Sequence, residues 1–162
     1  MPIRRGEKKT PIVSRGFFFP LAVFVLLVDQ LTKFWAVHSL EPAVSHPILL
    51  NFFHLTLVEN EGIAFGFFPR MEKILLVAVT LSIVVLIVFG LRAHPHRWVN
   101  RWGIGLILGG ALGNWVDRIR VGAVIDFLDF RIWPVFNFAD TAITIGVGLF
   151  FLELVTSRKH VS

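Results

Sequence analysis

The hydrophobic residues of this chain are concentrated in four long blocks that are separated by polar stretches. Ile74 to Leu91 contains eighteen uncharged residues, close to the length that crosses the ~30 Å apolar core of a bilayer. Each span has to be helical, because lipid offers no hydrogen-bond partners to the backbone. The pattern predicts a single all-α membrane domain over 1–162 with four transmembrane helices. We expect these helices at about 17–37, 74–91, 102–121 and 135–154.

The connections 38–73 and 122–134 are expected on the extracytoplasmic side of the membrane, and the first of them contains a strand pattern. Residues 53–58 alternate apolar and polar side chains, as a half-buried strand does. Asn60-Glu61-Gly62 follows as a turn signal. The sequence therefore predicts a small extracytoplasmic β-sheet element.

The basic residues predict the orientation of the helices. Ten of the sixteen Lys and Arg residues lie in the N-terminal tail, the connection 92–101 and the C-terminal tail. Positive charge favours the cytoplasmic side, so both termini are expected in the cytoplasm. A basic stretch before an apolar run is also typical of a cleavable signal peptide. Here no small-x-small cleavage site follows the run, and Asp29 and Lys33 interrupt it, so we expect a retained anchor.

The composition agrees with lipid as the solvent of this chain. Hydrophobic residues make up 55% of the chain and charged residues only 17%, against roughly 25% charged in soluble domains. The net charge of +5 comes from residues beside the apolar blocks, which favours a role in membrane orientation over nucleic-acid binding. Cysteine is absent, which excludes disulfides, a thiol nucleophile and thiolate metal ligands.

Charged residues inside apolar blocks are candidates for function, because a bilayer disfavours them by a few kcal/mol. Asp29 and Lys33 are four residues apart, so they share a helix face and can form a structural ion pair. Asp140 has no basic residue within a helical turn and lies six residues after Pro134, roughly 9 Å into the fourth helix. Alternatively, Asp140 is a protonated carboxylic acid with a structural role, and it forms hydrogen bonds between helices.

A second carboxylate lies close to Asp140 along the chain. Asp126 stands in an apolar stretch, and thirteen residues separate it from Asp140, so the chain can bring the two together. The nearby Asp117 and Arg118 are explained as interfacial anchors. Two close carboxylates in a poorly hydrated pocket share one proton. One of them can then take a proton from water while the other polarises a carbonyl, as in aspartic proteases.

The other catalytic arrangements are incomplete in this sequence. The six histidines form no His-Glu-x-x-His motif, no Walker-type glycine loop is present, and Ser39 lies six residues from Lys33 as a weak Ser–Lys pair. We therefore expect no metal site and no cofactor.

Five motifs resemble those of the bacterial lipoprotein signal peptidases (signal peptidase II), a family of aspartyl membrane proteases. They occur in the family's order and spacing between Asp29 and about Gly148. The motifs are Asp29-Gln-Leu-Thr-Lys33, Asn60-Glu-Gly-Ile-Ala-Phe-Gly66, Gly110-Ala-Leu-Gly-Asn-Trp-Val-Asp-Arg118, Gly122-Ala-Val-Ile-Asp-Phe-Leu-Asp-Phe130 and Phe136-Asn-Phe-Ala-Asp140.

The resemblance implies an endopeptidase that removes the signal peptide from diacylglyceryl-modified prolipoproteins, cleaving before the lipidated cysteine within the membrane. It implies that Asp126 and Asp140 are catalytic and that Asp29 and Lys33 form a structural polar pair. The residues implied to bind substrate or to support the site are Asn60, Gly62, Asn114, Arg118, Asp129 and Asn137.

The expected location is the bacterial cytoplasmic (inner) membrane, with several spans and the active site towards the extracytoplasmic side. The expected partners are the prolipoprotein substrate and membrane lipid. We expect no nucleic acid and a monomeric chain.

Two other classes of function share some of these features. A small transporter would use Asp126 and Asp140 to bind ions, but internal repeats and broken helices are not visible in the sequence. An assembly subunit would use the polar residues only to join helices. Substitution of the aspartates would then abolish folding rather than turnover.

Overall fold

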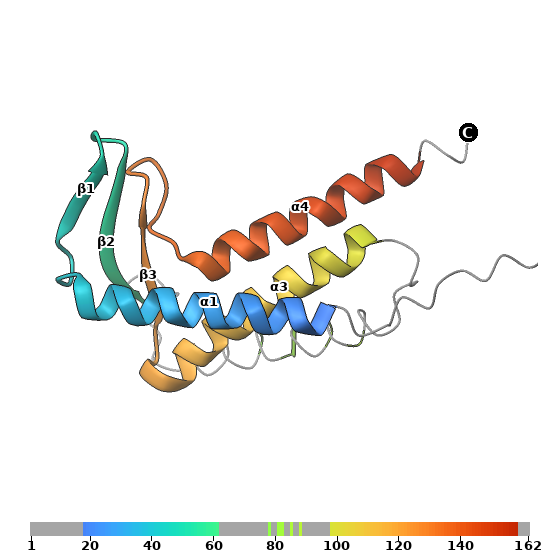
Figure 1. The fold of residues 1–162 in the computed structure, drawn as a ribbon, viewed down its shortest axis with the longest axis horizontal. Helices are drawn as coiled ribbons and strands as arrows, with labels where there is room; N and C mark the ends of the chain where they lie inside the picture. The colour runs from blue at the N-terminus through green and yellow to red at the C-terminus, as the bar shows by residue number, and fades with distance from the viewer. Residues whose placement is uncertain are drawn as a thin grey trace, which may run out of the picture.

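The structure is a computed structural model that describes residues 18–61, five helical positions within 78–88 and residues 98–158. Its elements are α1 (Phe18–Ser39), β1 (Ser45–Leu49), β2 (Phe53–Asn60), α3 (Trp98–Val121), β3 (Val124–Asp129) and α4 (Phe138–Arg158). The three long helices extend from a small sheet at one end of the molecule (Figure 1).

The surface of α1 is suited to lipid. Leu27, Leu31 and Phe34 are each more than half exposed on this helix, although water would disfavour such apolar exposure. Among the residues that the structure describes, α1 alone is long and apolar enough to cross a membrane, while α4 contains a shorter apolar stretch, Phe138–Leu152. Four transmembrane helices and cytoplasmic termini therefore remain predictions.

Glycines allow α3 to approach both of its neighbours closely. A Cβ atom on Gly109 would lie 2.6 Å from the backbone oxygen of Ala22 in α1. A Cβ atom on Gly110 would lie 2.5 Å from the backbone oxygen of Ala139 in α4. Small residues at such interfaces are typical of helices that pack in lipid. The polar groups of α1 and α4 can therefore meet those of α3.

The predicted sheet element is confirmed. Its three strands are antiparallel in the order β1-β2-β3, and β2 covers the alternating stretch 53–58. The inner side chains of β2 and β3 pack on the end of α1, where Ala36, Leu57, Ile125 and Phe127 form a buried cluster. This packing fixes the sheet, and with it Asp126 of β3, against the helices.

Three segments differ from the sequence-based expectation. The third helix begins at Trp98 rather than near 102. β3 forms inside the expected connection 122–134, because this apolar stretch pairs with β2. The fourth helix begins at Phe138 rather than near 135, since Phe136 is held in a bridge with Leu128.

Part of the predicted second span and Gly62 lie outside the described residues. The described positions of that span are 78, 81, 82, 85 and 88, and all of them are helical and exposed.

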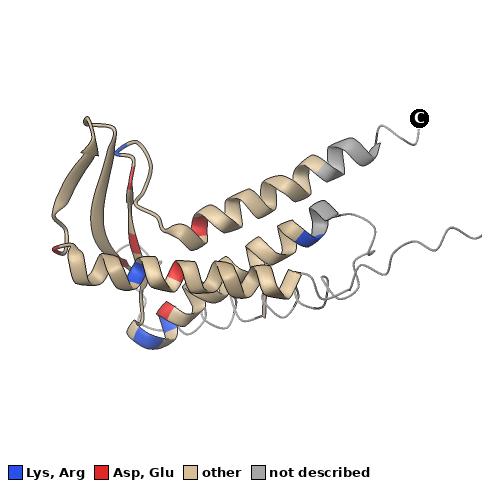
Figure 2. Cartoon of the chain, in the orientation of Figure 1, with Lys and Arg blue, Asp and Glu red and all other residues tan. Residues whose placement is uncertain are grey.

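The charged residues are unevenly distributed along the helices. Acidic and basic residues gather where the helices meet the sheet, and long stretches of helix carry none (Figure 2). This end of the molecule therefore holds the candidate site.

Candidate active site

Asp126 lies on β3 and is almost completely buried, with 2% of its surface exposed. The pairing of β2 with β3 places Val58 opposite Asp126, so the end of β2 can contact its carboxylate. Asn60 donates a side-chain N–H to Asp126 Oδ2 over 2.8 Å. Asn137, just before α4, donates to Oδ1 over 2.7 Å. Each carboxylate oxygen thus has an amide donor.

Asp140 lies in the first turn of α4 and takes part in the cap of this helix. Asn137 Oδ1 accepts the backbone N–H of Asp140 over 2.9 Å, and Asp140 Oδ2 accepts the backbone N–H of Asn137 over 3.3 Å. This reciprocal pair has the form of a capping box. Asp140 Oδ1 also accepts an N–H from Asn114 of α3 over 2.8 Å. The cap and the Asn114 contact together fix the carboxylate at the start of the helix.

Asn137 connects the two aspartates. Its side-chain N–H₂ group donates to Asp126, and its side-chain oxygen and backbone N–H both bind Asp140. The structure therefore brings the predicted pair to the same small polar site.

The surroundings raise the pKa of Asp126 from its ordinary value of 3.8 to about 6. Burial is the main cause, because it disfavours the charged form, and the charge of Asp140 acts in the same direction. The hydrogen bonds from Asn60 and Asn137 oppose this rise. Asp126 can consequently hold a proton at a pH where an exposed aspartate is ionised.

Asn114 links this site to a second polar cluster inside the helices. Its side-chain oxygen accepts from Asn137 over 3.1 Å and from Lys33 Nζ over 2.8 Å. One turn further along α3, Arg118 donates to the backbone oxygen of Asn114 over 3.2 Å. Asn60, Asn114 and Asn137 thus all contact the aspartates directly, whereas Arg118 contacts the backbone that carries Asn114.

Asp29 and Lys33 form the expected ion pair, but they have further partners. The distance from Lys33 Nζ to Asp29 Oδ2 is 2.9 Å, and both side chains are buried. Asp29 Oδ1 accepts the backbone N–H of Ala139 in the first turn of α4 over 2.9 Å. This pair therefore binds the helix that carries Asp140.

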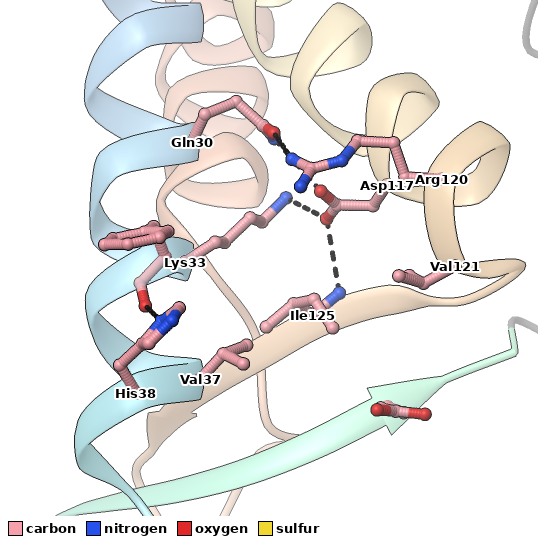
Figure 3. A pocket seen from close by; sticks show the side chains of 10 residues that line it. Gln30, Lys33, Val37, His38, Asp117, Arg120, Val121 and Ile125 are labelled. Atoms are coloured by element: carbon pink, nitrogen blue, oxygen red, sulfur yellow. Dashed lines mark hydrogen bonds and ion pairs between the residues drawn. The ribbon is translucent and has the colours of Figure 1, made fainter.

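Asp117 was expected at the membrane interface, and this expectation is wrong because the side chain is buried, with 4% exposed. Its Oδ2 lies 2.6 Å from Lys33 Nζ and accepts the backbone N–H of Ile125, and its Oδ1 accepts an N–H of Gln30. Figure 3 shows Lys33 reaching from α1 towards Asp117 of α3 and Ile125 of β3. Neither Asp117 nor Gln30 was identified as a site residue, although both belong to the motifs that the sequence shows.

Asp129 is the last residue of β3. It lies three positions after Asp126, which contacts Asn137. Its carboxylate accepts from the Thr56 hydroxyl and from the backbone N–H of Arg131, each over 2.8 Å, and it pairs with the Arg131 guanidinium at 3.2 Å. Burial acts to raise the pKa of Asp129, but the hydrogen bonds from Arg131 and Thr56 outweigh it and lower the pKa. These contacts stabilise the sheet and the loop after it, and a role of Asp129 towards substrate remains a prediction.

An apolar cavity of about 330 Å³ lies beside Asp140. It is lined by Phe130, Trp133, Phe136, Thr141, Thr144 and Ile145 as well as by Asp140 itself. Within the part of the chain that the structure describes, no group of three or more His, Cys, Asp or Glu side chains could hold a metal ion. The arrangement offers two carboxylates next to an apolar recess.

Comparison with protein families agrees with this arrangement. A family model described as signal peptidase (SPase) II matches residues 21–156. The chain belongs to the signal peptidase II family. It is thus an integral membrane peptidase by family, and the resemblance seen in its motifs is confirmed.

Individual members of the signal peptidase II family are similar over most of their length. The lipoprotein signal peptidase of Pelotomaculum thermopropionicum is 47% identical over 147 residues, which is 90% of this chain and 96% of that protein. That of Moorella thermoacetica is 45% identical over 139 residues, or 85% and 92% of the two chains. The solved structure of a bacterial membrane enzyme superposes on this chain with a TM-score of 0.82 and 29% sequence identity. The superposition includes 91% of this chain and 92% of the chain of that enzyme.

Proposed function

We propose that this chain is an aspartyl endopeptidase that removes the signal peptide from diacylglyceryl-modified prolipoproteins, cutting before the lipidated cysteine within the membrane. One observation carries the proposal. Asn137 binds both carboxylates, because its side-chain N–H₂ group donates to Asp126 and its backbone N–H donates to Asp140 Oδ2. Two carboxylates held this close are suited to sharing one proton.

The two aspartates have different roles in the proposed reaction. Asp126, with a pKa of about 6, is the member that keeps the proton and donates it to the carbonyl oxygen of the scissile bond. Asp140 takes a proton from a water molecule, whose oxygen attacks the carbonyl carbon. When the tetrahedral intermediate collapses, the C–N bond breaks, the amine leaving group receives the proton from Asp140, and Asp126 recovers a proton from a hydroxyl group of the intermediate. This division follows the logic of general acid and general base catalysis.

The surrounding residues support this chemistry in different ways. Asn60, Asn114 and Asn137 donate to the carboxylates and hold them in place. The apolar cavity beside Asp140 suits an apolar segment of the signal peptide. Substrate-supporting roles for Arg118, Asp129 and Gly62 are part of the proposal through the family resemblance.

The proposed setting is the bacterial cytoplasmic membrane. We infer one domain with four transmembrane helices, both termini in the cytoplasm, and the sheet and active site on the extracytoplasmic side. The lipid-suited surface of α1 and the gathering of charges at one end of the helices support this arrangement. The chain is proposed to work as a monomer within lipid, without metal, cofactor or nucleic acid.

The test is cleavage of a lipidated prolipoprotein by Asp126→Asn and Asp140→Asn, each shown to insert into membranes as the unchanged protein does. Each substitution should lower kcat by about 10³-fold or more, since it removes a proton donor or acceptor. Glu41→Gln is the matched control, because Glu41 is exposed between α1 and β1 and should retain full activity. Appreciable cleavage by either aspartate variant would remove the pair from the mechanism. Loss of folding in both would assign the pair a structural rather than a catalytic role.

A further inference from the structure

The ammonium group of Lys33 is buried among three acceptors that come from two helices. Its Nζ lies 2.9 Å from Asp29 Oδ2, 2.6 Å from Asp117 Oδ2 and 2.8 Å from Asn114 Oδ1. An ammonium group has three N–H donors and no acceptor. These contacts therefore satisfy all three N–H donors of Lys33. One carboxylate would be enough to neutralise its charge, so the contact with the neutral Asn114 amide is not explained by charge pairing.

The contact with Asn114 determines which way the amide of Asn114 faces. Its oxygen receives two donors, Lys33 Nζ and Asn137 Nδ2, so its N–H₂ group is left to donate to Asp140 Oδ1. An amide turned by 180° would place N–H₂ against two other N–H donors and its oxygen against the carboxylate of Asp140. Both contacts of the turned amide would be repulsive.

We propose that Lys33 is a positioning residue, whose ammonium fixes the Asn114 amide so that its N–H₂ group faces Asp140. This inference rests on the proposed role of Asp140 in proton transfer. Without the ammonium, the Asn114 oxygen keeps only the 3.1 Å contact with Asn137. The amide is then held less firmly, and so is the Asp140 carboxylate oxygen Oδ1 to which it donates. A displacement of about 1 Å in a reacting group can cost about 10²-fold in rate.

A purely structural role for Lys33 predicts a different result. An ion pair that only joins α1 to α3 would, when broken, lower the stability of the fold because a buried charge loses its partner. Catalysis by the molecules that remain folded would be unchanged. Rate measurements on folded protein therefore distinguish the two roles.

The first experiment replaces Lys33 by alanine and returns the missing group from solution. Lys33, Gln30, Asp117 and Arg120 line a cavity of about 170 Å³, seen in Figure 3, through which a small amine can enter. Lys33→Ala should lower kcat by about 10²-fold with little change in KM. Propylammonium, which matches the missing atoms, should restore at least about a tenth of the lost rate, whereas propanol should not.

Asn114→Ala is the matched control for this rescue. It should lower kcat as Lys33→Ala does, and propylammonium should have no effect on it, because the amide through which Lys33 acts is gone. The double variant should be no slower than the slower single variant, since residues that act in one network are not additive. A rise in KM at unchanged kcat, or a folded Lys33→Ala enzyme that propylammonium does not rescue, would overturn the proposal.

A second variant covers the case in which Lys33→Ala does not fold. Asp29, Lys33 and Asp117 together carry one net negative charge, and Lys33→Met combined with Asp117→Asn also leaves one. This pair of changes therefore removes the ammonium without changing the net charge of the buried cluster. It should fold and show the same loss of kcat. Turnover near that of the unchanged enzyme would contradict the role of Lys33.

A spectroscopic measurement separates this proposal from the proposed function. The side-chain amide signals of Asn114, assigned by their loss in Asn114→Ala, should move in the Lys33 variants and stay in place in an Arg120→Gln control. Unchanged Asn114 signals in the Lys33 variants would overturn the positioning role. If the amide signals move but Asp140→Asn retains activity, the proposed function is wrong and the positioning of Asn114 by Lys33 still holds.

Discussion

Asp29, in the middle of α1, accepts the backbone N–H of Ala139 in the first turn of α4 through its Oδ1, over 2.9 Å. The first N–H groups of a helix have no partner within that helix. Asp29 thus accepts the N–H of Ala139, the residue before Asp140. Asn137, which directly precedes α4, accepts the N–H of Asp140 in the same turn. Two caps fix the start of the helix that carries a proposed catalytic group.

The first prediction concerns this contact. Asp29→Ala should lower the free energy of unfolding by about 1–3 kcal/mol, because the Ala139 N–H loses its acceptor while buried. Asp29→Asn keeps a side-chain oxygen that can accept and should cost less. Thermal unfolding of the purified variants in detergent measures both losses. Equal losses would show that the charge of Asp29, rather than the cap, stabilises the fold.

The second prediction concerns the close approach of α3 and α4. Gly110→Ala should destabilise the fold by about 1–3 kcal/mol, as overpacking does. Its Cβ atom would lie 2.5 Å from the backbone oxygen of Ala139, which cannot move aside as a flexible side chain can. Gly148→Ala in α4 is the control, because nothing lies within 4 Å of the added atom. It should be equal to the unchanged protein or more stable, since alanine is favoured in helices. A similar loss in both variants would contradict the packing argument.

Local patterns in the sequence predicted the parts of this fold that depend on neighbours along the chain. The alternation in 53–58 predicted β2, and Asn137-Phe-Ala-Asp140 has the spacing of a helix cap that would have placed the start of α4 correctly. β3 was missed because its apolar run was interpreted only as the setting of Asp126. The β-branched residues Val124 and Ile125, shortly after the turn residue Gly122, were the available signal in the sequence.

Contacts between distant residues could not be derived from such patterns. Asp117 follows an apolar block directly, and its position alone fits an anchor at the membrane interface. Its burial depends on Lys33, 84 positions earlier, and on the backbone of Ile125. Spacing along one helix predicts that Asp29 meets Lys33. It does not predict that Asp117, on another helix, binds Lys33 as well.

The third prediction is a pH dependence caused by Asp126. Its folded pKa of about 6 lies above the ordinary 3.8, so the folded state binds the proton more strongly than the unfolded state. Stability from this group is therefore complete below about pH 4 and is lost as the pH rises through about 6. Asp126→Asn should remove this slope. Denaturation of both proteins between pH 4 and 8 measures it, and parallel curves would contradict the raised pKa.

The fourth prediction concerns Asp129, for which the sign is opposite. Its pKa is lowered because hydrogen bonds from Arg131 and Thr56 outweigh the effect of burial. The stability that it contributes is therefore present above the unfolded pKa and is lost as the pH falls through the folded one. Asp129→Asn should lower stability at neutral pH by about 1 kcal/mol, with a smaller difference from the unchanged protein in acid.

The effect of Asp129→Asn on turnover decides whether this residue belongs to the catalytic site. Its carboxylate binds Thr56 and Arg131, and neither residue contacts the Asn137 amide that joins Asp126 to Asp140. Thr56→Val removes a donor to the same carboxylate and serves as the matched variant. If Asp129 acts only through the sheet, both variants should lose stability and keep kcat within about threefold, as substitutions away from the reacting groups do. A loss of kcat in Asp129→Asn alone, measured well below the unfolding temperature, would instead support contact between Asp129 and the substrate.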